Sequence, residues 1–212
     1  MKTPLLATIL FAAVPAAFAG TLNLSTGLDA SNNLITSGGL SDAHWTVNEQ
    51  AGGTGAAQTV YPGNADWYGG WLDDGPNSDW IARDASISNN GPAPYTFQVT
   101  FSLADTTGAS LSGSWAVDDS GTIDLNGNQI GSLGSGAWGG LTSVSDNSHF
   151  VTGLNTLSIT ISSDDEFLEA VRFEGSVTGD LGSPAVPEPA SMVLLAGGML
   201  AIAVAKRRRK AV

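Results

Sequence analysis

Aspartate is the residue type that offers most chemistry in this chain. Two groups of carboxylates lie close together in the sequence: Asp73, Asp74 and Asp79, and then Asp118, Asp119 and Asp124. Carboxylate oxygens in loops are ligands that calcium accepts, so Asp73, Asp74, Asp118 and Asp119 are candidate calcium ligands. Paired carboxylates also serve acid–base catalysis, but neighbouring residues of a strand point to opposite faces. We therefore expect that Asp118 and Asp119 cannot face each other, and that a bound ion would be structural.

Other catalytic patterns are missing from the sequence. The two histidines, His44 and His149, stand far apart and neither belongs to an HExxH motif. The chain has no GxSxG segment. It has no cysteine, which excludes disulfides and thiolate metal sites. We therefore predict a protein that is not an enzyme and that needs no cofactor other than a calcium ion.

Tryptophan is the second residue type with binding potential, because an indole ring can stack on the apolar face of a sugar. The chain has six tryptophans, and Trp67 and Trp71 lie in the loop-like stretch NADWYGGWLDDGPN. These two are candidate carbohydrate contacts on an exposed surface. The alternative is that they pack in the interior, where aromatic rings bury large areas. Trp115 lies on the inward face of a predicted strand, and we expect it in the core.

The elements that must position these residues are predicted to be strands and turns. The segment 95–103, YTFQVTFSL, alternates apolar and polar residues without a break, which is the period of a half-buried strand. TIDLNGNQI indicates a hairpin that turns at Asn126-Gly127. About eight such strands favour an all-β sandwich of jelly-roll type. The further predicted strands are 34–36, 44–48, 80–83, 111–117, 155–162 and 169–177.

Part of this pattern resembles a known fold family. Trp115, Asp118 and Asp119 precede an LNG hairpin at 125–127, and the segment GLNTL follows at 153–157. In this order the residues are similar to the galactose-binding-like jelly rolls of exported bacterial proteins. The resemblance covers roughly residues 79–178. It implies the fold, and it implies little about the ligand because this fold hosts many functions.

Charge is distributed very unevenly along the chain. Six of the eight basic residues are Lys2 and the run 206–210, whereas residues 20–186 hold 19 acidic residues and two arginines. A body with a net charge of −17 (two minus 19) repels phosphate backbones, so we expect no nucleic-acid partner.

The first 19 residues have the features of a secretory signal peptide. Lys2 supplies the positive start, residues 5–14 form a short apolar core, and Ala17-Phe18-Ala19 is a small-x-small cleavage site. We predict cleavage between Ala19 and Gly20, and hence an exported protein.

The C-terminus combines an apolar run with a cluster of cations. Sixteen residues from Ala190 to Ala205 would span about 24 Å as a helix, which is short for a bilayer core of about 30 Å. The basic residues that follow can lengthen the span by reaching into the interface. We predict a short transmembrane helix in the inner membrane with its C-terminus in the cytoplasm. Its interface anchors would be Lys206, Arg207, Arg208, Arg209 and Lys210.

A proline-rich segment lies directly before this helix. In the motif Pro187-Glu188-Pro189, neither proline can continue a helix, and each holds the residue before it in an extended conformation. The order of PEP, apolar helix and arginine cluster resembles the PEP-CTERM sorting signal of Gram-negative bacteria that make extracellular polysaccharide. The resemblance implies processing by an exosortase, which is a membrane-embedded cysteine transpeptidase.

These observations predict four segments: a signal peptide (1–19), a β-sandwich ectodomain (20–178), a Gly/Pro linker with the PEP motif (179–189), and the helix with its basic tail (190–212). The predicted protein is a non-enzymatic component of the cell surface or extracellular matrix, in the setting of an exopolysaccharide-rich biofilm. A carbohydrate-binding module that attaches to exopolysaccharide is the alternative, and a polysaccharide hydrolase is a third hypothesis.

Overall fold

A computed structural model describes residues 19–49, 54–60, 69–84, 94–162 and 169–182. Contacts within the chain separate residues 1–182 from residues 183–212, and only the first unit contains described residues. The predicted transmembrane helix, the PEP motif and the first 18 residues therefore lie outside the described part. Within that part, no helix has the length and apolarity that a membrane span requires.

The described chain consists of eleven strands and one 3₁₀ turn, η1, at Ala137–Gly139. All strand pairs are antiparallel. In chain order the strands are β1 (Ala19–Asn23), β2 (Ser41–Glu49), β3 (Thr54–Val60), β4 (Trp80–Ala82), β5 (Tyr95–Leu103), β6 (Asp105–Asp118), β7 (Ser120–Leu125), β8 (Asn128–Leu133), β9 (Thr142–Asp146), β10 (Gly153–Ser162) and β11 (Ala170–Asp180).

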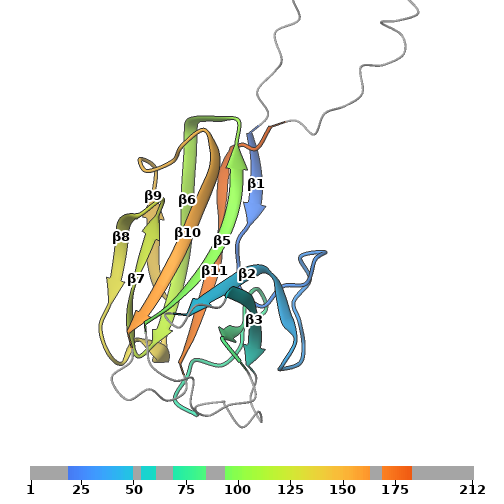
Figure 1. Cartoon of the computed structure of the whole chain (residues 1–212), viewed down its shortest axis with the longest axis vertical. Coiled ribbons are helices and arrows are strands. Elements are labelled where there is room, and N and C mark those ends of the chain that lie inside the picture. Colours follow the sequence, from blue (N-terminus) through green and yellow to red (C-terminus); the bar gives the residue numbers. More distant parts are fainter. Residues whose placement is uncertain (1–18, 50–53, 61–68, 85–93, 163–168, 183–212) are drawn as a thin grey trace, which may run out of the picture. The chain divides into compact units, whose positions relative to one another are not determined.

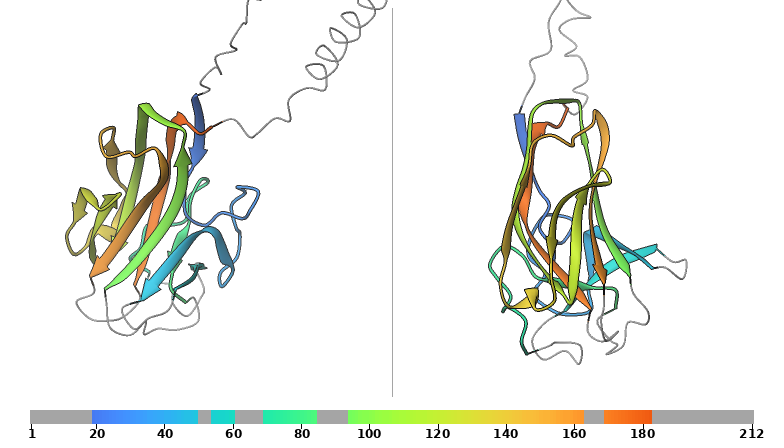
Figure 2. Two further views of the ribbon diagram at one scale, coloured as in Figure 1. Left: turned by 45° about the horizontal axis from the view of Figure 1, so that its top comes forward. Right: turned by 90° about the vertical axis from the view of Figure 1, so that its left-hand side faces the viewer.

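The strands form two layers that face each other (Figures 1 and 2). One layer has the order β8-β7-β10-β5-β2, and the other has the order β4-β11-β6-β9 with β1 also paired to β11. Strand β3 pairs with both β2 and β4 and so joins the layers along one side. The fold is thus an all-β sandwich of jelly-roll-like form, as the sequence predicts.

The core lies between the layers and follows the predicted alternation. In β5 the side chains of Tyr95, Phe97 and Val99 are buried, and their ladder partners in β10 are Ile161, Ile159 and Leu157. Alternate residues such as Thr100 and Ser102 are exposed. The other layer adds Trp115, Phe173 and Val177, all at most 1% exposed. Two facing stripes of large apolar side chains therefore hold the sandwich together.

The predicted hairpin is confirmed. Strands β7 and β8 are joined by Asn126 and Gly127, which have φ values of 53° and 78°. Positive φ at both central residues is the requirement of the type I′ turn, and asparagine followed by glycine meets it at low cost.

Four of the strand assignments differ between the sequence prediction and the structure. The strand expected at 34–36 is wrong: in this region the structure has one isolated bridge, between Leu28 and Leu34. The sequence does not predict strands β1, β3 and β9, because their small and polar residues hide the alternation. Two of these three flank β11 and β6, where they matter for the surfaces described below.

Candidate functional site

A cluster of buried carboxyl groups lies where β6 ends and β11 begins. Asp118 is the last residue of β6, and its register partner is Ala170, the first residue of β11. Asp119 follows β6, and Glu169 directly precedes β11. The exposed fractions of Asp118, Asp119 and Glu169 are only 6%, 8% and 1%. The antiparallel pairing of two strands thus gathers three acidic residues that are up to 51 positions apart.

Asp118 and Asp119 interact through their side chains, so the expectation that they cannot face each other is wrong. A hydrogen bond between the two carboxyl groups helps to raise the pKa of Asp118. The alternation of side chains applies only within a strand, and β6 ends at Asp118. The direction of Asp119 is therefore set by the connection to β7, which the periodicity of the strand does not describe.

Burial raises the pKa of the Asp118 carboxyl to about 8. The indole N–H of Trp71 donates to Asp118 Oδ2 at 2.6 Å and opposes the shift, whereas Asp119 and Glu169 add to it. A carboxyl group with this pKa is protonated at neutral pH and can donate its own proton to Asp119. A hydrogen bond between the two carboxyl groups therefore joins Asp118 to Asp119.

Trp71 is buried, which contradicts the expectation that it is exposed. Its exposed fraction is 4%, and its ring stacks on Trp80 with the centroids 4.9 Å apart. The stretch 69–79 folds back on the outer face of β4, β6 and β11. Alanines there leave room for the two rings, and Leu72, Trp138 and Leu141 pack around the cluster. The buried members are Val60, Trp71, Trp80, Ala82, Ala116 and Ala170.

A sequence signal for this second apolar cluster exists in β6. The outward positions of the strand are Ser110, Ser112 and Ser114, and the next one is Ala116. A change from serine to alanine on the outward face indicates that a covering segment begins there. Trp67, the other candidate carbohydrate contact, lies outside the described residues. Trp115 is in the main core, as predicted.

The other two candidate calcium ligands lie beside a buried arginine. Arg172 points outward from β11, is 2% exposed, and donates to Ser78 Oγ at 2.9 Å and to the carbonyl of Asp73 at 2.6 Å. Burial raises the pKa of Asp74 to about 6, although the positive charge of Arg172 and the backbone of Trp80 act in the opposite direction. Asp73 thus contributes its backbone, and Asp74 contributes its charge, to the same cation.

These four aspartates do not fit a calcium ion as one site. Calcium binds ionised carboxylates, whereas Asp118 holds a proton at neutral pH and accepts the indole of Trp71. Asp74 already has a guanidinium as its electrostatic partner. Across the ranges that the structure describes, no three acidic or histidine side chains are placed to hold a metal ion together.

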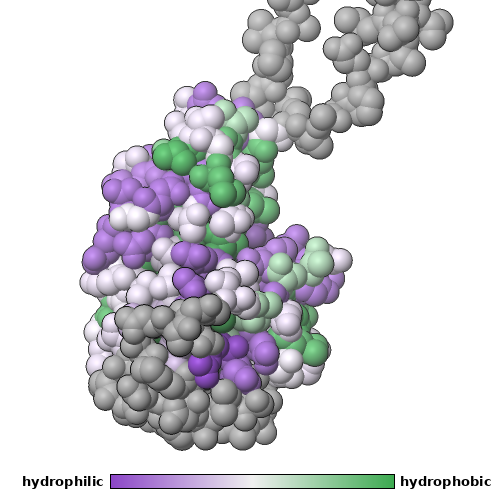
Figure 3. All heavy atoms as spheres, in the orientation of Figure 1, coloured by the Kyte–Doolittle hydropathy of each residue, from purple (hydrophilic) through white to green (hydrophobic). Residues whose placement is uncertain are grey.

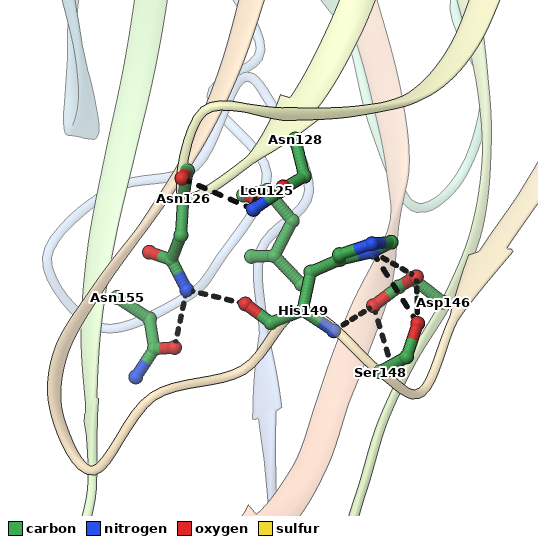
Figure 4. Close-up of polar contacts among 7 residues, drawn as sticks. All are labelled: Leu125, Asn126, Asn128, Asp146, Ser148, His149 and Asn155. Atoms are coloured by element: carbon green, nitrogen blue, oxygen red, sulfur yellow. Dashed lines mark hydrogen bonds and ion pairs between the residues drawn. The ribbon is translucent and has the colours of Figure 1, made fainter.

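A second polar cluster lies in the loop between β9 and β10 (Figure 4). His149 Nδ1 lies 2.7 Å from Asp146 Oδ1, and the backbone N–H groups of Ser148 and His149 both donate to Asp146 Oδ2 at 3.0 Å. Burial acts to raise the pKa of Asp146, but these hydrogen bonds outweigh it and lower the pKa. Asp146 therefore stays ionised and fixes the loop.

The Ser-His-Asp composition of this cluster does not form a catalytic triad. A histidine base holds the aspartate with one ring nitrogen and the nucleophile with the other. Here the Ser148 hydroxyl lies 3.4 Å from Nδ1 of His149, and 3.2 Å from Asp146 Oδ1. The serine therefore shares the aspartate side of the ring, and the arrangement stabilises the loop.

The motif residues Asn126 and Asn155 have a structural role. Asn126 Nδ2 donates to Asn155 Oδ1 and to the carbonyl of His149, both at 2.8 Å, and Asn126 Oδ1 accepts the N–H of Thr156 at 2.9 Å. Asn155 is fully buried and also holds both backbone groups of Val151. The LNG and GLNTL segments thus lock the β7–β8 turn onto the start of β10 (Figure 4).

The outer face of β6 and β9 carries two overlapping hollows of about 370 Å³ each. They share Ser112 and Ser145, which are register partners. Five of the ten lining residues are serines, and Asp146 is the acidic residue among them. The lining residues are Ser110, Leu111, Ser112, Gly113, Ser114, Ser143, Val144, Ser145, Asp146 and Asn147.

Solved structures with a similar arrangement of strands have low sequence identity to this chain. The FMN-binding β-glucuronidase from Facaelibacterium prausnitzii L2-6 is 15% identical with a TM-score of 0.38; the match covers 77% of this chain and 23% of that one. A family 35 carbohydrate-binding module from an environmental isolate is 16% identical with a TM-score of 0.35, covering 66% and 97%. The family 35 module from Clostridium thermocellum is 13% identical with a TM-score of 0.36, covering 63% and 90%.

No curated protein sequence matches the chain. One family model does, and it is described as the PEP-CTERM protein-sorting motif. The match runs from residue 185 to residue 209, and includes Pro187, Glu188, Pro189 and the first four cations of the run 206–210. The C-terminal segment of this chain, beginning three residues after the last described residue of the sandwich, is a PEP-CTERM sorting motif.

Proposed function

We propose that this chain is an exported, non-enzymatic protein of the cell surface or extracellular matrix, delivered through its C-terminal sorting motif. The observation that carries the proposal is the match of residues 185–209 to the PEP-CTERM motif. A membrane-embedded transpeptidase of the exosortase type is the implied partner. It would cut near Pro187-Glu188-Pro189 and release the sandwich from its tail.

The route to the surface follows from the two ends of the chain. The signal peptide directs residues from Gly20 onward across the inner membrane. The apolar run 192–205 and the cations 206–210 then hold the tail in that membrane, with the C-terminus in the cytoplasm, until processing. The acidic sandwich is on the outer side throughout, where its charge keeps it soluble and away from nucleic acids.

A non-enzymatic role for the sandwich is supported by how its reactive side chains are used. Asp118 bonds to Trp71, Asp74 lies beside Arg172, and His149 is bound to Asp146 by the nitrogen that Ser148 also contacts. Asp118 and His149 thus have hydrogen-bond partners within the sandwich, and the charge of Asp74 is balanced by Arg172. The ectodomain would act as a stable, folded component of a polysaccharide-rich exterior.

Mass spectrometry of the mature C-terminus tests the proposal. In cells that contain an exosortase, we expect a chain that ends near Pro189, and in cells without the enzyme we expect Val212 to be retained. Pro187→Ala should prevent processing, and Pro184→Ala, just before the matched segment, is the matched control that should not. A wild-type chain that keeps Val212 in the presence of the enzyme would contradict the proposal.

Carbohydrate binding is a second candidate function. The observation that favours it is the pair of hydroxyl-lined hollows on β6 and β9, because uncharged donors and acceptors suit a neutral polysaccharide. Trp67 stays a candidate stacking residue for the same ligand. Trp71 would contribute only indirectly, because it is buried against Trp80.

Affinity electrophoresis in gels that contain the exopolysaccharide of the producing cells tests this candidate. If the protein binds there, the retardation should be lost in Ser112→Val and Ser145→Val, which remove hydroxyls but suit a strand. Thr100→Val and Ser102→Val on the exposed face of β5 are the matched controls. Retardation that depends on Trp67 alone would move the site away from β9. Hydrolysis of the polysaccharide that stops in Asp119→Asn would instead favour a hydrolase.

A further inference from the structure

Backbone contacts hold the C-terminal end of the sandwich together up to Gly182, three residues before the matched sorting motif begins. Strand β1 pairs with the last five residues of β11, in the register Ala19 to Asp180 through Asn23 to Ser176. Strand β11 is also bonded to the β5–β6 connection, because the N–H of Ala104 donates to the carbonyl of Asp180 at 2.7 Å. After the predicted cleavage before Gly20, the pairs from Gly20–Gly179 to Asn23–Ser176 remain, and Asp180 is still held by Ala104 and by its β6 partner Asp105.

The two residues that follow β11 belong to the fold as well. Leu181 packs against the main core, and its side chain crosses Gly20 so closely that a Cβ there would lie 2.8 Å from Leu181 Cδ1. The N–H of Gly182 donates to Asp180 Oδ1 at 3.0 Å, and Gly182 has a φ of 73°, which favours glycine. The chain thus leaves the sandwich at Gly182.

Very little chain separates this exit from the PEP motif. Residues 183–186 are the only ones between Gly182 and Pro187. From Gly182 to Pro187, five residue steps reach at most about 18 Å, even when fully extended. An enzyme that binds an extended peptide needs access to its backbone on both sides of the bond that it cuts. The folded sandwich must therefore stand directly beside the enzyme during processing.

We propose that residues 183–186 act as a tether of minimal length for exosortase processing, and that the β1–β11 pairing fixes where this tether begins. The inference rests on the proposed function of the tail. It adds that length, rather than sequence, is what these four residues contribute.

The β1–β11 pairing also explains how the sandwich can fold before processing. Ala19, the last residue of the predicted signal peptide, is opposite Asp180 in the ladder. The chain therefore enters and leaves the sandwich at one end, where Figure 1 shows β1 beginning beside the end of β11. After the predicted cleavage before Gly20, only the C-terminal segment is held at the membrane, and a domain of this topology can stay folded while that end is held.

A length series in the full chain tests the tether. Residues 183–186 are deleted, replaced by Gly-Ser-Gly-Ser, or replaced by eight Gly/Ser residues, and the processed fraction is measured by mass spectrometry in cells that contain the exosortase. We expect the deletion to lower the processed fraction at least tenfold. Both replacements should restore it to the wild-type value. All changes lie outside the sandwich, so its folding is unaffected.

Equal processing of the deletion and the wild type would overturn the inference, and so would a loss of processing in the Gly-Ser-Gly-Ser chain, since that would assign the effect to sequence. Pro187→Ala in the unaltered tether is the control for the motif itself. If the wild-type chain is not processed at all, the proposed function fails, whereas an effect of Pro187→Ala without an effect of length overturns only the tether.

Discussion

Asp118 and Asp146 are both poorly exposed carboxyl groups, yet the sandwich shifts their pKa values in opposite directions. Asp146 receives hydrogen bonds from Ser148 and His149, through backbone and side chains at 2.7 to 3.2 Å. Asp118 receives the indole of Trp71, but Asp119 and Glu169 lie close to it. Burial alone therefore does not decide the charge of a carboxyl group; the balance of donors and neighbouring charges does.

The two clusters also differ in what surrounds them. The Asp146 cluster continues through His149 and Asn126 to the buried Asn155, so that polar groups satisfy one another over a whole turn region. The Asp118 cluster adjoins the apolar layer of Trp71 and Trp80. On the space-filling view of Figure 3, hydrophilic residues gather on the left of the visible face, and hydrophobic residues gather in its upper middle and upper right. Hydrogen bonds around Asp146 and apolar packing beside Asp118 thus both stabilise the sandwich.

The largest loss of stability is expected when the satisfied network is broken at its centre. In Asn155→Ala, the side chain of Asn126 and the backbone groups of Val151 and Gly153 lose their partners. Buried groups without partners are costly, so the free energy of unfolding should fall by about 3 kcal/mol. Urea unfolding measures this. Asn128→Ala, at an exposed position with longer bonds of 3.3 Å, is the control and should cost less than about 0.5 kcal/mol. Equal losses in the two variants would contradict the role of Asn155.

The second prediction concerns how the free energy of unfolding changes with pH because of Asp118. Because the folded-state pKa is raised, its contribution to stability is fully present below the unfolded value and is lost as the pH rises towards about 8. Asp118→Asn keeps an acceptor for Trp71 and a donor for Asp119 but cannot ionise. From pH 5 to pH 9 it should therefore gain roughly 4 kcal/mol over the wild type, which is about 1.4 kcal/mol for each of the three pH units between pH 5 and the folded-state pKa of about 8. A constant difference between the two proteins across this range would contradict the raised pKa.

Asp146→Asn should show the opposite behaviour. A lowered pKa gives stability that is present above the unfolded value and is lost as the pH falls through the folded value. The variant should therefore be less stable than the wild type at pH 7, and the difference should shrink towards pH 3. Thermal unfolding at the two pH values measures it. A deficit that grows on acidification would show that Asp146 is not the ionised centre of its loop.

Calcium should have the smallest effect. Since Asp118 is protonated and Asp74 lies beside Arg172, these groups should not bind the ion at neutral pH. Adding millimolar calcium, or a chelator, should move the melting temperature by less than about 1 °C. A calcium-dependent rise of several degrees that disappears in Asp118→Asn would restore the calcium hypothesis for this cluster.

Local patterning predicted most of the fold and little of the candidate site. The unbroken alternation of β5 and the Asn126-Gly127 turn are properties of a few consecutive residues, so the sequence predicts them well. Strands such as β9 were missed because serine and threonine dominate them. The burial of Trp71 could not be predicted, because it depends on a loop that packs on Ala116 and Ala170, which lie far from Trp71 in the sequence. The prediction that Asp118 and Asp119 cannot face each other is wrong for a similar reason, because their contact arises where β6 ends.

The central claim is that the acidic cluster at the end of β6 is part of the architecture of the sandwich, whereas the sorting chemistry resides in the tail. The most direct test is the titration of the Asp118 side-chain carbon by ¹³C NMR in the folded protein, with Asp118→Asn to assign the signal. We predict a midpoint of about 8. A midpoint near 4, the ordinary value of an aspartate, would show an ionised carboxylate that is free to bind a cation or act in catalysis, and would contradict the account.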